Sequence, residues 1–176
     1  MAKKKLLRVL LIEDELAHQE LILHYLSHSY FFNHQITCCA SFQETSMKIR
    51  DGAYDIVLTD LSLPDSSANE TLGKLKSLGI KCPIVSLTSL DDDLVISKLI
   101  QQGASDCIPK MHLNPSLLDR TIRYSLDRHE LEKEKLDRSR EMKEAMFQST
   151  RVSYLVTDLS WQFIEWNPGF EMFTGY

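Results

Sequence analysis

Four of the five apolar runs in the first 128 residues end in side chains that can take part in phosphoryl chemistry. The first run ends in Glu13 and Asp14, and the third ends in Asp60. Thr88 closes the fourth run and Lys110 follows the fifth. Carboxylates held close together repel each other unless a cation joins them, and oxygen ligands of this kind suit Mg²⁺. Together with a hydroxyl and an ammonium, they predict a phosphoryl-transfer site with Asp60 as the nucleophile and Mg²⁺ as the cofactor.

Each of these residues taken alone has a simpler interpretation. A strand-end Asp is more often a helix cap or a turn residue, and Lys110 alone is a solvated surface lysine. The prediction depends on their order along the chain. An acidic pair, an Asp, a hydroxyl and a Lys stand at the ends of the first, third, fourth and fifth predicted strands.

Helical spacing between the apolar runs indicates that strands and helices alternate. The predicted strands are Leu6–Ile12, Gln35–Ala40, Ile56–Thr59, Pro83–Thr88 and Asp106–Ile108. Alternation with short connections means parallel strands joined by right-handed crossover helices, which cover both faces of the sheet. Ligands of such sheets bind beyond the carboxyl ends of the strands. We therefore predict a doubly wound α/β domain over residues 1–128, with the polar residues above at its binding edge.

The last helix of this domain is predicted to continue as a helical linker over residues 129–150. It starts at Pro115, and no Gly or Pro occurs from Leu117 to Gln148. A seam of apolar residues runs along it with gaps, and we expect the helix to pair with a second copy of the chain. A solvated single helix is the alternative. The seam consists of Leu118, Ile122, Ser125, Leu126, His129, Leu136, Met142, Ala145 and Met146.

Residues 151–176 differ in pattern from the linker. Tyr154–Asp158 and Trp161–Trp166 predict two strands around a turn, followed by the start of a helix. Two strands and one helical turn are too few for an independent unit. We therefore expect this segment to be the beginning of a further domain.

Composition limits the partners and the cellular location that we expect for this chain. The chain has 20 basic and 25 acidic residues among 176, a formal charge of −5, which argues against nucleic acid as a partner. No apolar run approaches the roughly 18 residues of a membrane span. The four cysteines form no C-x-x-C pair and are expected to be reduced. A cytoplasmic protein that contacts neither nucleic acid nor membrane is the expectation.

The segments around these residues resemble the response-regulator receiver family from about Leu6 to Arg128. The motifs that carry the resemblance are Val9–Asp14, Asp55–Asp65, Pro83–Ser89 and Gly103–Lys110. The resemblance implies the flavodoxin-like sheet order 2-1-3-4-5. It also implies a signalling domain rather than a dedicated enzyme, since receivers catalyse only their own phosphorylation and dephosphorylation.

The same resemblance assigns a role to each site residue. It implies that Asp60 accepts the phosphoryl group from a histidine kinase or a phosphotransfer protein. Glu13 and Asp14 would bind Mg²⁺ with it, and the backbone carbonyl of Ser62 would complete the metal site. Thr88 and Lys110 would contact the phosphoryl oxygens. We also expect a homodimer, through the last helix and linker or through the face formed by the fourth helix, fifth strand and last helix.

One position departs from the family pattern. Receivers usually carry Tyr or Phe three residues before the lysine, and this ring turns inward when the hydroxyl residue moves. Here the position is Cys107. We expect the switch to differ while phosphoryl acceptance remains, because no acidic or lysine position is lost.

The C-terminal segment resembles the opening of a PAS sensor domain. The resemblance rests on Val156–Asp158 and on the stretch from Trp166 to Tyr176. It implies that the chain is a fragment of a larger receiver–PAS signalling protein, with a kinase or cyclic-dinucleotide enzyme as possible output.

Two other functions share the predicted fold. An FMN-binding flavodoxin needs a Ser-, Thr- and Gly-rich phosphate loop after the first strand, where this chain has Glu13-Asp14-Glu15. An interaction module with a vestigial acidic pocket would dimerise without phosphorylation. Mg²⁺ binding separates both from a receiver.

Overall fold

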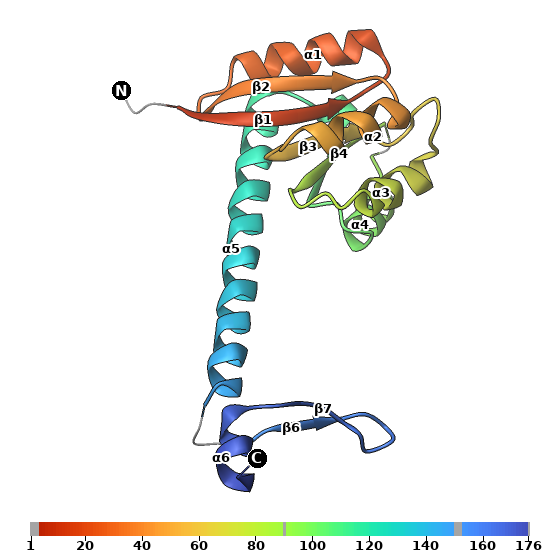
Figure 1. Ribbon diagram of the computed structural model, residues 1–176. Helices are drawn as coiled ribbons and strands as arrows, with labels where there is room; N and C mark the ends of the chain where they lie inside the picture. The colour runs from red at the N-terminus through yellow and green to blue at the C-terminus, as the bar shows by residue number, and fades with distance from the viewer. Residues whose placement is uncertain (1–3, 90, 150–152, 176) are drawn as a thin grey trace. The chain divides into compact units, whose positions relative to one another are not determined.

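The computed structural model describes residues 4–89, 91–149 and 153–175 (Figure 1). Contacts divide the chain into two compact units, Met1–His129 and Glu130–Tyr176. The first unit holds one parallel sheet in the order β2-β1-β3-β4-β5. Its strands are β1 (Lys5–Ile12), β2 (Phe32–Cys39), β3 (Ile56–Asp60), β4 (Ile84–Thr88) and β5 (Asp106–Pro109). The predicted flavodoxin-like fold and strand order are confirmed.

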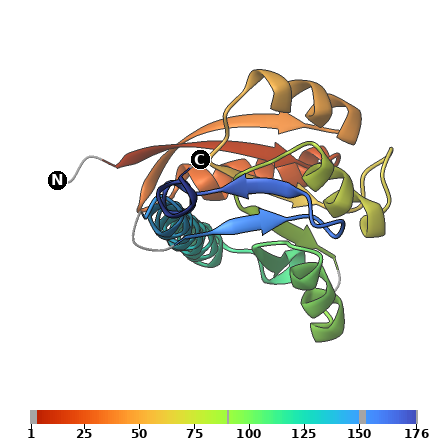
Figure 2. The same ribbon diagram turned by 60° about the horizontal axis from the view of Figure 1, so that its bottom comes forward.

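Helices cover both faces of this sheet (Figures 1 and 2). They are α1 (Leu16–Ser27), α2 (Phe42–Asp51), α3 (Ala68–Ser77), α4 (Asp93–Gln101) and α5 (Pro115–Phe147), with a 3₁₀ turn η1 (Lys110–His112). Successive side chains of β1 point to opposite faces of the sheet, so its apolar residues must be buried on both faces. Val9 and Leu11 pack with α1 and α5, whereas Leu10 and Ile12 pack with α3 and α4.

Local signals placed most helix ends correctly. Ser41 caps α2, its Oγ accepting a hydrogen bond from Glu44 N–H at 3.1 Å. The reciprocal bond of the predicted capping box is displaced by one residue, because the Glu44 carboxylate accepts from Ala40 N–H at 2.9 Å. Helix α5 begins at Pro115 as predicted. Strand β2 begins at Phe32, three residues before its predicted start, because pairing with β1 extends to Lys5.

The apolar seam of α5 divides into two parts with different surroundings. Leu118 and Ile122 are buried against the sheet of the first unit. Leu136, Met142 and Met146 are 64%, 65% and 50% exposed. Leu118 and Ile122 are therefore not available to pair with a second copy, because their own domain already covers them.

The second unit contains the end of α5, the antiparallel pair β6 (Leu155–Thr157) and β7 (Phe163–Trp166), and α6 (Pro168–Thr174). Asn167 is fully buried and accepts hydrogen bonds from the N–H groups of Tyr154, at 2.7 Å, and Phe170, at 3.1 Å. Residues 151, 152 and 176 of the predicted PAS segment lie outside the described residues.

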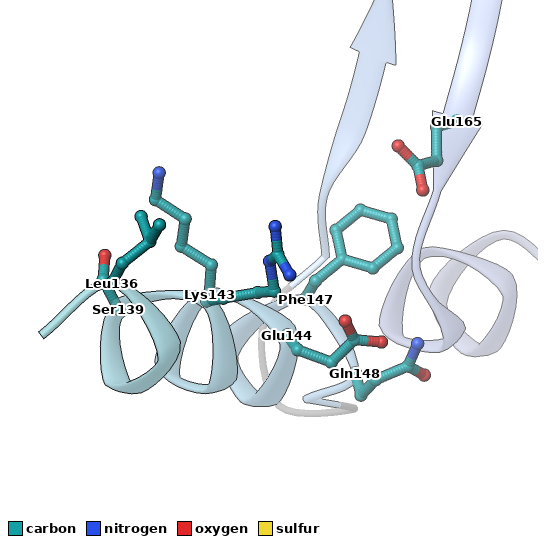
Figure 3. A pocket seen from close by; sticks show the side chains of 8 residues that line it. Leu136, Ser139, Lys143, Glu144, Phe147, Gln148 and Glu165 are labelled. Atoms are coloured by element: carbon teal, nitrogen blue, oxygen red, sulfur yellow. The ribbon is translucent and has the colours of Figure 1, made fainter. Parts of the chain in front are cut away.

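A shallow hollow of about 540 Å³ lies within this second unit. Figure 3 shows Phe147 projecting from the end of α5 beside it, with Glu165 of β7 at its border. Its other lining residues are mainly polar or charged side chains of α5: Leu136, Ser139, Arg140, Lys143, Glu144 and Gln148. It contains none of the predicted site residues. Across the described part of the chain, no helix is both long and apolar enough to span a membrane.

Candidate functional site

Three carboxylates meet at the carboxyl edge of the sheet. Strands β1 and β3 are neighbours in register, with Ile12 paired to Thr59, so the residues that follow them lie side by side. Glu13 is fully buried, Asp60 is 7% exposed and Asp14 is exposed. One oxygen from each lies within 4.8 Å of the others. The structure therefore brings together the three predicted side-chain metal ligands.

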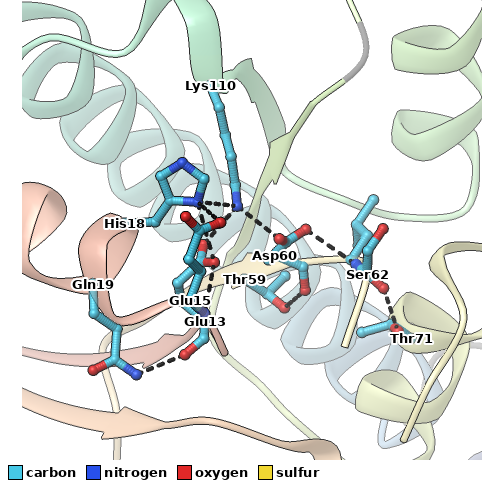
Figure 4. A network of polar contacts seen from close by, with 10 residues as sticks. Glu13, Glu15, His18, Gln19, Thr59, Asp60, Ser62, Thr71 and Lys110 are labelled. Atoms are coloured by element: carbon cyan, nitrogen blue, oxygen red, sulfur yellow. Dashed lines mark hydrogen bonds and ion pairs between the residues drawn. The ribbon is translucent and has the colours of Figure 1, made fainter. Parts of the chain in front are cut away.

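Lys110 lies between two of these carboxylates (Figure 4). Its Nζ is 2.7 Å from Asp60 Oδ2 and 2.8 Å from Glu13 Oε2. Burial alone would lower the pKa of this ammonium, but its hydrogen bonds and charge interactions with Asp60 and Glu13 outweigh burial and raise it. Lys110 is therefore a fixed positive charge beside Asp60.

The acidic cluster has the donor set that Mg²⁺ requires. Glu13 Oε2 is buried and, apart from its ion pair with Lys110, accepts no hydrogen bond of good geometry from the described residues. Asp14 is open to water, which suits an ion that keeps part of its hydration shell. Ser62 lies beside the cluster and donates its N–H to Asp60 Oδ1 at 3.0 Å. These residues fit a small divalent cation.

The loop after Asp60 is held by two residues that the sequence did not single out. Thr71 is fully buried, and its Oγ1 lies 2.7 Å from the carbonyl oxygen of Leu61. Asp65 accepts hydrogen bonds from Phe42 N–H at 2.8 Å and Gln43 N–H at 2.9 Å, at the start of α2. A carboxylate near a helix N-terminus is favourable, but the long sequence separation hid this pairing.

Thr88 ends β4 beside Asp60, because Asp60 pairs in register with Leu87. It is 6% exposed. Thr88 and Asp60 both line a cavity of about 190 Å³ between the loop after β3, the end of β4, and α4. All four residue types predicted at the strand ends thus lie around one site.

His18 is a further neighbour that sequence reasoning missed. Its Nδ1 lies 3.2 Å from Lys110 Nζ and 3.1 Å from Glu15 Oε2. Figure 4 shows its ring beside the end of Lys110. Its only signal in the sequence was its place in the first turn of the helix that follows the acidic pair.

Cys107 lies in β5 and is half-buried against the core cluster beneath α3 and α4. Burial, with a smaller contribution from the charge of Asp106, raises the pKa of its thiol to about 11. The side chain at this position is therefore small, neutral and apolar in behaviour.

Comparisons with known proteins identify the family of this chain. The family model described as the response regulator receiver domain matches residues 9–123, more than half of the chain. The chain belongs to the response regulator receiver family. A receiver domain protein (CheY-like) from Methanospirillum hungatei is 25% identical, with a TM-score of 0.61, covering 74% of this chain and 99% of its own.

The curated relatives match about two thirds of this chain and a smaller share of their own length. A cyclic di-GMP phosphodiesterase of Thermotoga maritima is 30% identical over 67% of this chain and 30% of its own length. The swarming motility regulation protein RssB of Serratia marcescens is 26% identical over 65% of this chain and 51% of its own length. The chain thus spans about half or less of the length of these relatives.

Proposed function

We propose that this receiver accepts a phosphoryl group on Asp60 from a histidine kinase or a phosphotransfer protein. The observation that carries the proposal is Lys110 Nζ, held 2.7 Å from Asp60 in the middle of an acidic cluster. A structural ion pair alone would not account for the third carboxylate, Asp14, directed to the same place. An interaction module with a vestigial pocket would need none of this arrangement.

The transfer step follows from the side chains at the site. An oxygen of the ionised Asp60 carboxylate attacks the phosphorus of a phosphohistidine. The new O–P bond forms as the P–N bond breaks, and the electron pair of that bond stays on the imidazole nitrogen. Lys110 would neutralise charge on the transferring oxygens, and the Thr88 hydroxyl would donate a hydrogen bond to one of them.

Mg²⁺ would be held by the carboxylates of Glu13, Asp14 and Asp60, with the backbone carbonyl of Ser62 as a fourth protein ligand. When bound, it reduces repulsion between Asp60 and the incoming phosphoryl group. Lys110, which pairs with both Glu13 and Asp60, holds these two carboxylates close together.

We further propose that residues 1–128 are the receiver, 129–150 a helical linker, and 151–176 the first part of a PAS domain. The exposed Leu136, Met142 and Met146 on the outer half of α5 support pairing of the linker with a second copy. A face formed by α4, β5 and α5 is the other dimer surface proposed. Phosphorylation would be relayed through α5 to the region that follows.

Reductive trapping tests the acceptor directly. The protein is incubated with Mg²⁺ and acetyl phosphate and then treated with borohydride, which reduces an aspartyl phosphate to homoserine. Peptide mass spectrometry should find homoserine at position 60 and aspartate at positions 14 and 65. Unreduced aspartate at position 60 would contradict the proposal.

A further inference from the structure

The cavity beside Asp60 has a polar wall on α4 that the proposed chemistry does not use. Asp60, Ser62 and Thr88 line this space of about 190 Å³, and so do Lys98 of α4 and Gln102, which follows the helix. Since a water molecule occupies about 30 Å³ of liquid, the space can hold a phosphoryl group with some solvent. A group attached to Asp60 would enter a cavity that α4 borders.

Lys110 alone cannot balance the negative charge of a phosphoryl group on Asp60. Its single ammonium is shared between Asp60 and Glu13, at 2.7 and 2.8 Å. A phosphoryl group adds about 1.5–2 negative charges at neutral pH. Mg²⁺ and Lys110 would together supply three positive charges, against about 3.5–4 negative charges on Glu13, Asp14 and the aspartyl phosphate, so part of the negative charge is still unbalanced.

Lys98 is the one cationic side chain among the described residues that line the cavity. It is exposed, and the ion pairs found among the described residues do not include it. It lies in the last turn of α4 and lines the same cavity as Asp60. A lysine has a flexible four-carbon stem, so its ammonium can move to a new anion at low cost.

We propose that Lys98 is a second cation of the phosphoacceptor site, pairing with the phosphoryl group as it arrives on Asp60 and while it remains there. The inference rests on the proposed function of Asp60 and adds a positioning residue to it. Because Lys98 belongs to α4, the contact ties that helix to the state of Asp60. Cys107, whose small thiol packs in the same cluster as Val95 and Leu99 of α4, leaves this helix without a bulky ring beneath it.

Lys98→Gln removes the charge and keeps a polar side chain of similar length. Lys81→Gln is the matched control, because Lys81 is also exposed but precedes β4, at the opposite edge of the sheet. The initial rate of phosphorylation by acetyl phosphate with Mg²⁺ should fall about fivefold in the Lys98 variant, or about 1 kcal/mol. The magnitude follows from the upper range of exposed ion pairs. Lys98→Arg should restore most of the rate.

Two further readouts separate this role from a structural one. Raising the ionic strength from about 0.05 M to 0.5 M should shrink the difference between wild type and Lys98→Gln, because salt screens exposed charges. Hydrogen exchange in the α4 peptide should slow when beryllofluoride, a phosphoryl mimic, is added to the wild type. The same addition should change exchange much less in Lys98→Gln.

The outcomes are distinguishable. If the wild type gains no phosphoryl group, the proposed function fails and the role of Lys98 fails with it. If the wild type is phosphorylated but Lys98→Gln matches Lys81→Gln in rate, salt dependence and α4 exchange, only the second cation is overturned. A loss of rate in Lys98→Gln that Lys98→Arg does not restore, and that salt does not reduce, would also overturn it.

Discussion

Replacing Lys110 by methionine removes the cation that lies between two buried carboxylates. Glu13 is fully buried and Asp60 is 7% exposed, so neither is well screened by water once the ammonium is gone. Removing one partner of a buried ion pair costs about 3–5 kcal/mol. We expect about 3 kcal/mol at pH 7.5, the lower end, because Asp60 keeps the hydrogen bond from Ser62 N–H.

The loss of folding stability in Lys110→Met should depend on pH and on divalent cations. In the wild type the raised pKa of Lys110 means that its contribution is complete below about pH 10 and is lost as the pH rises through the folded-state pKa. The difference in the free energy of unfolding between the wild type and Lys110→Met should therefore shrink between about pH 7.5 and pH 11, as the ammonium loses its proton.

Urea unfolding in EDTA at both pH values measures this difference, with Lys81→Met as the exposed-lysine control. Adding about 10 mM Mg²⁺ should then stabilise Lys110→Met more than the wild type, because the ion binds the carboxylates that lost their cation. A penalty below about 1 kcal/mol that is the same at both pH values would refute the reasoning. Such a result would mean that water reaches Glu13 and Asp60 freely.

Two smaller effects follow from other contacts. The N–H groups of Phe42 and Gln43 lower the pKa of Asp65, so its contribution is present above about pH 4 and is lost as the pH falls through the lower folded-state value. Asp65→Ala should thus lower the free energy of unfolding in urea by up to about 1 kcal/mol at pH 7 and by almost nothing near pH 2. An equal loss at both pH values would contradict the role of the Asp65 carboxylate at the start of α2. Burial raises the pKa of Cys82 and Cys107 to about 11, so iodoacetamide at pH 7.5 should label them about 100-fold more slowly in the native protein than in urea. Equal labelling rates would show that these thiols are not buried.

The parallel sheet could be predicted because apolar runs alternate with helical segments along the chain. Its strand order came from the resemblance to the receiver family, and that order brings Glu13 and Asp60 together at the binding edge. The contacts of Asp65 with α2 and of His18 with Lys110 could not be predicted in the same way. Asp65 and Phe42 are 23 residues apart, and His18 and Lys110 are 92 apart. No local pattern specifies such pairs.

The surface that covers the first part of the α5 seam could not be predicted for a related reason. Leu118 and Leu136 have the same helical periodicity, but only the folded domain shows that Leu118 is covered by the sheet. Periodicity gives the face of a helix and not the identity of the surface that covers it. Burial by the chain's own sheet therefore competes with pairing to a second copy, and it determines the first part of the seam.

The central claim is that Asp60 is the acceptor in a Mg²⁺-dependent transfer. Intact mass after incubation with acetyl phosphate, for the wild type and Asp60→Asn with and without EDTA, tests it most directly. The account predicts a gain of one phosphoryl group (about 80 Da) in the wild type with Mg²⁺ and none in Asp60→Asn or in EDTA. An unchanged wild-type mass, or an equal gain in Asp60→Asn, would contradict it.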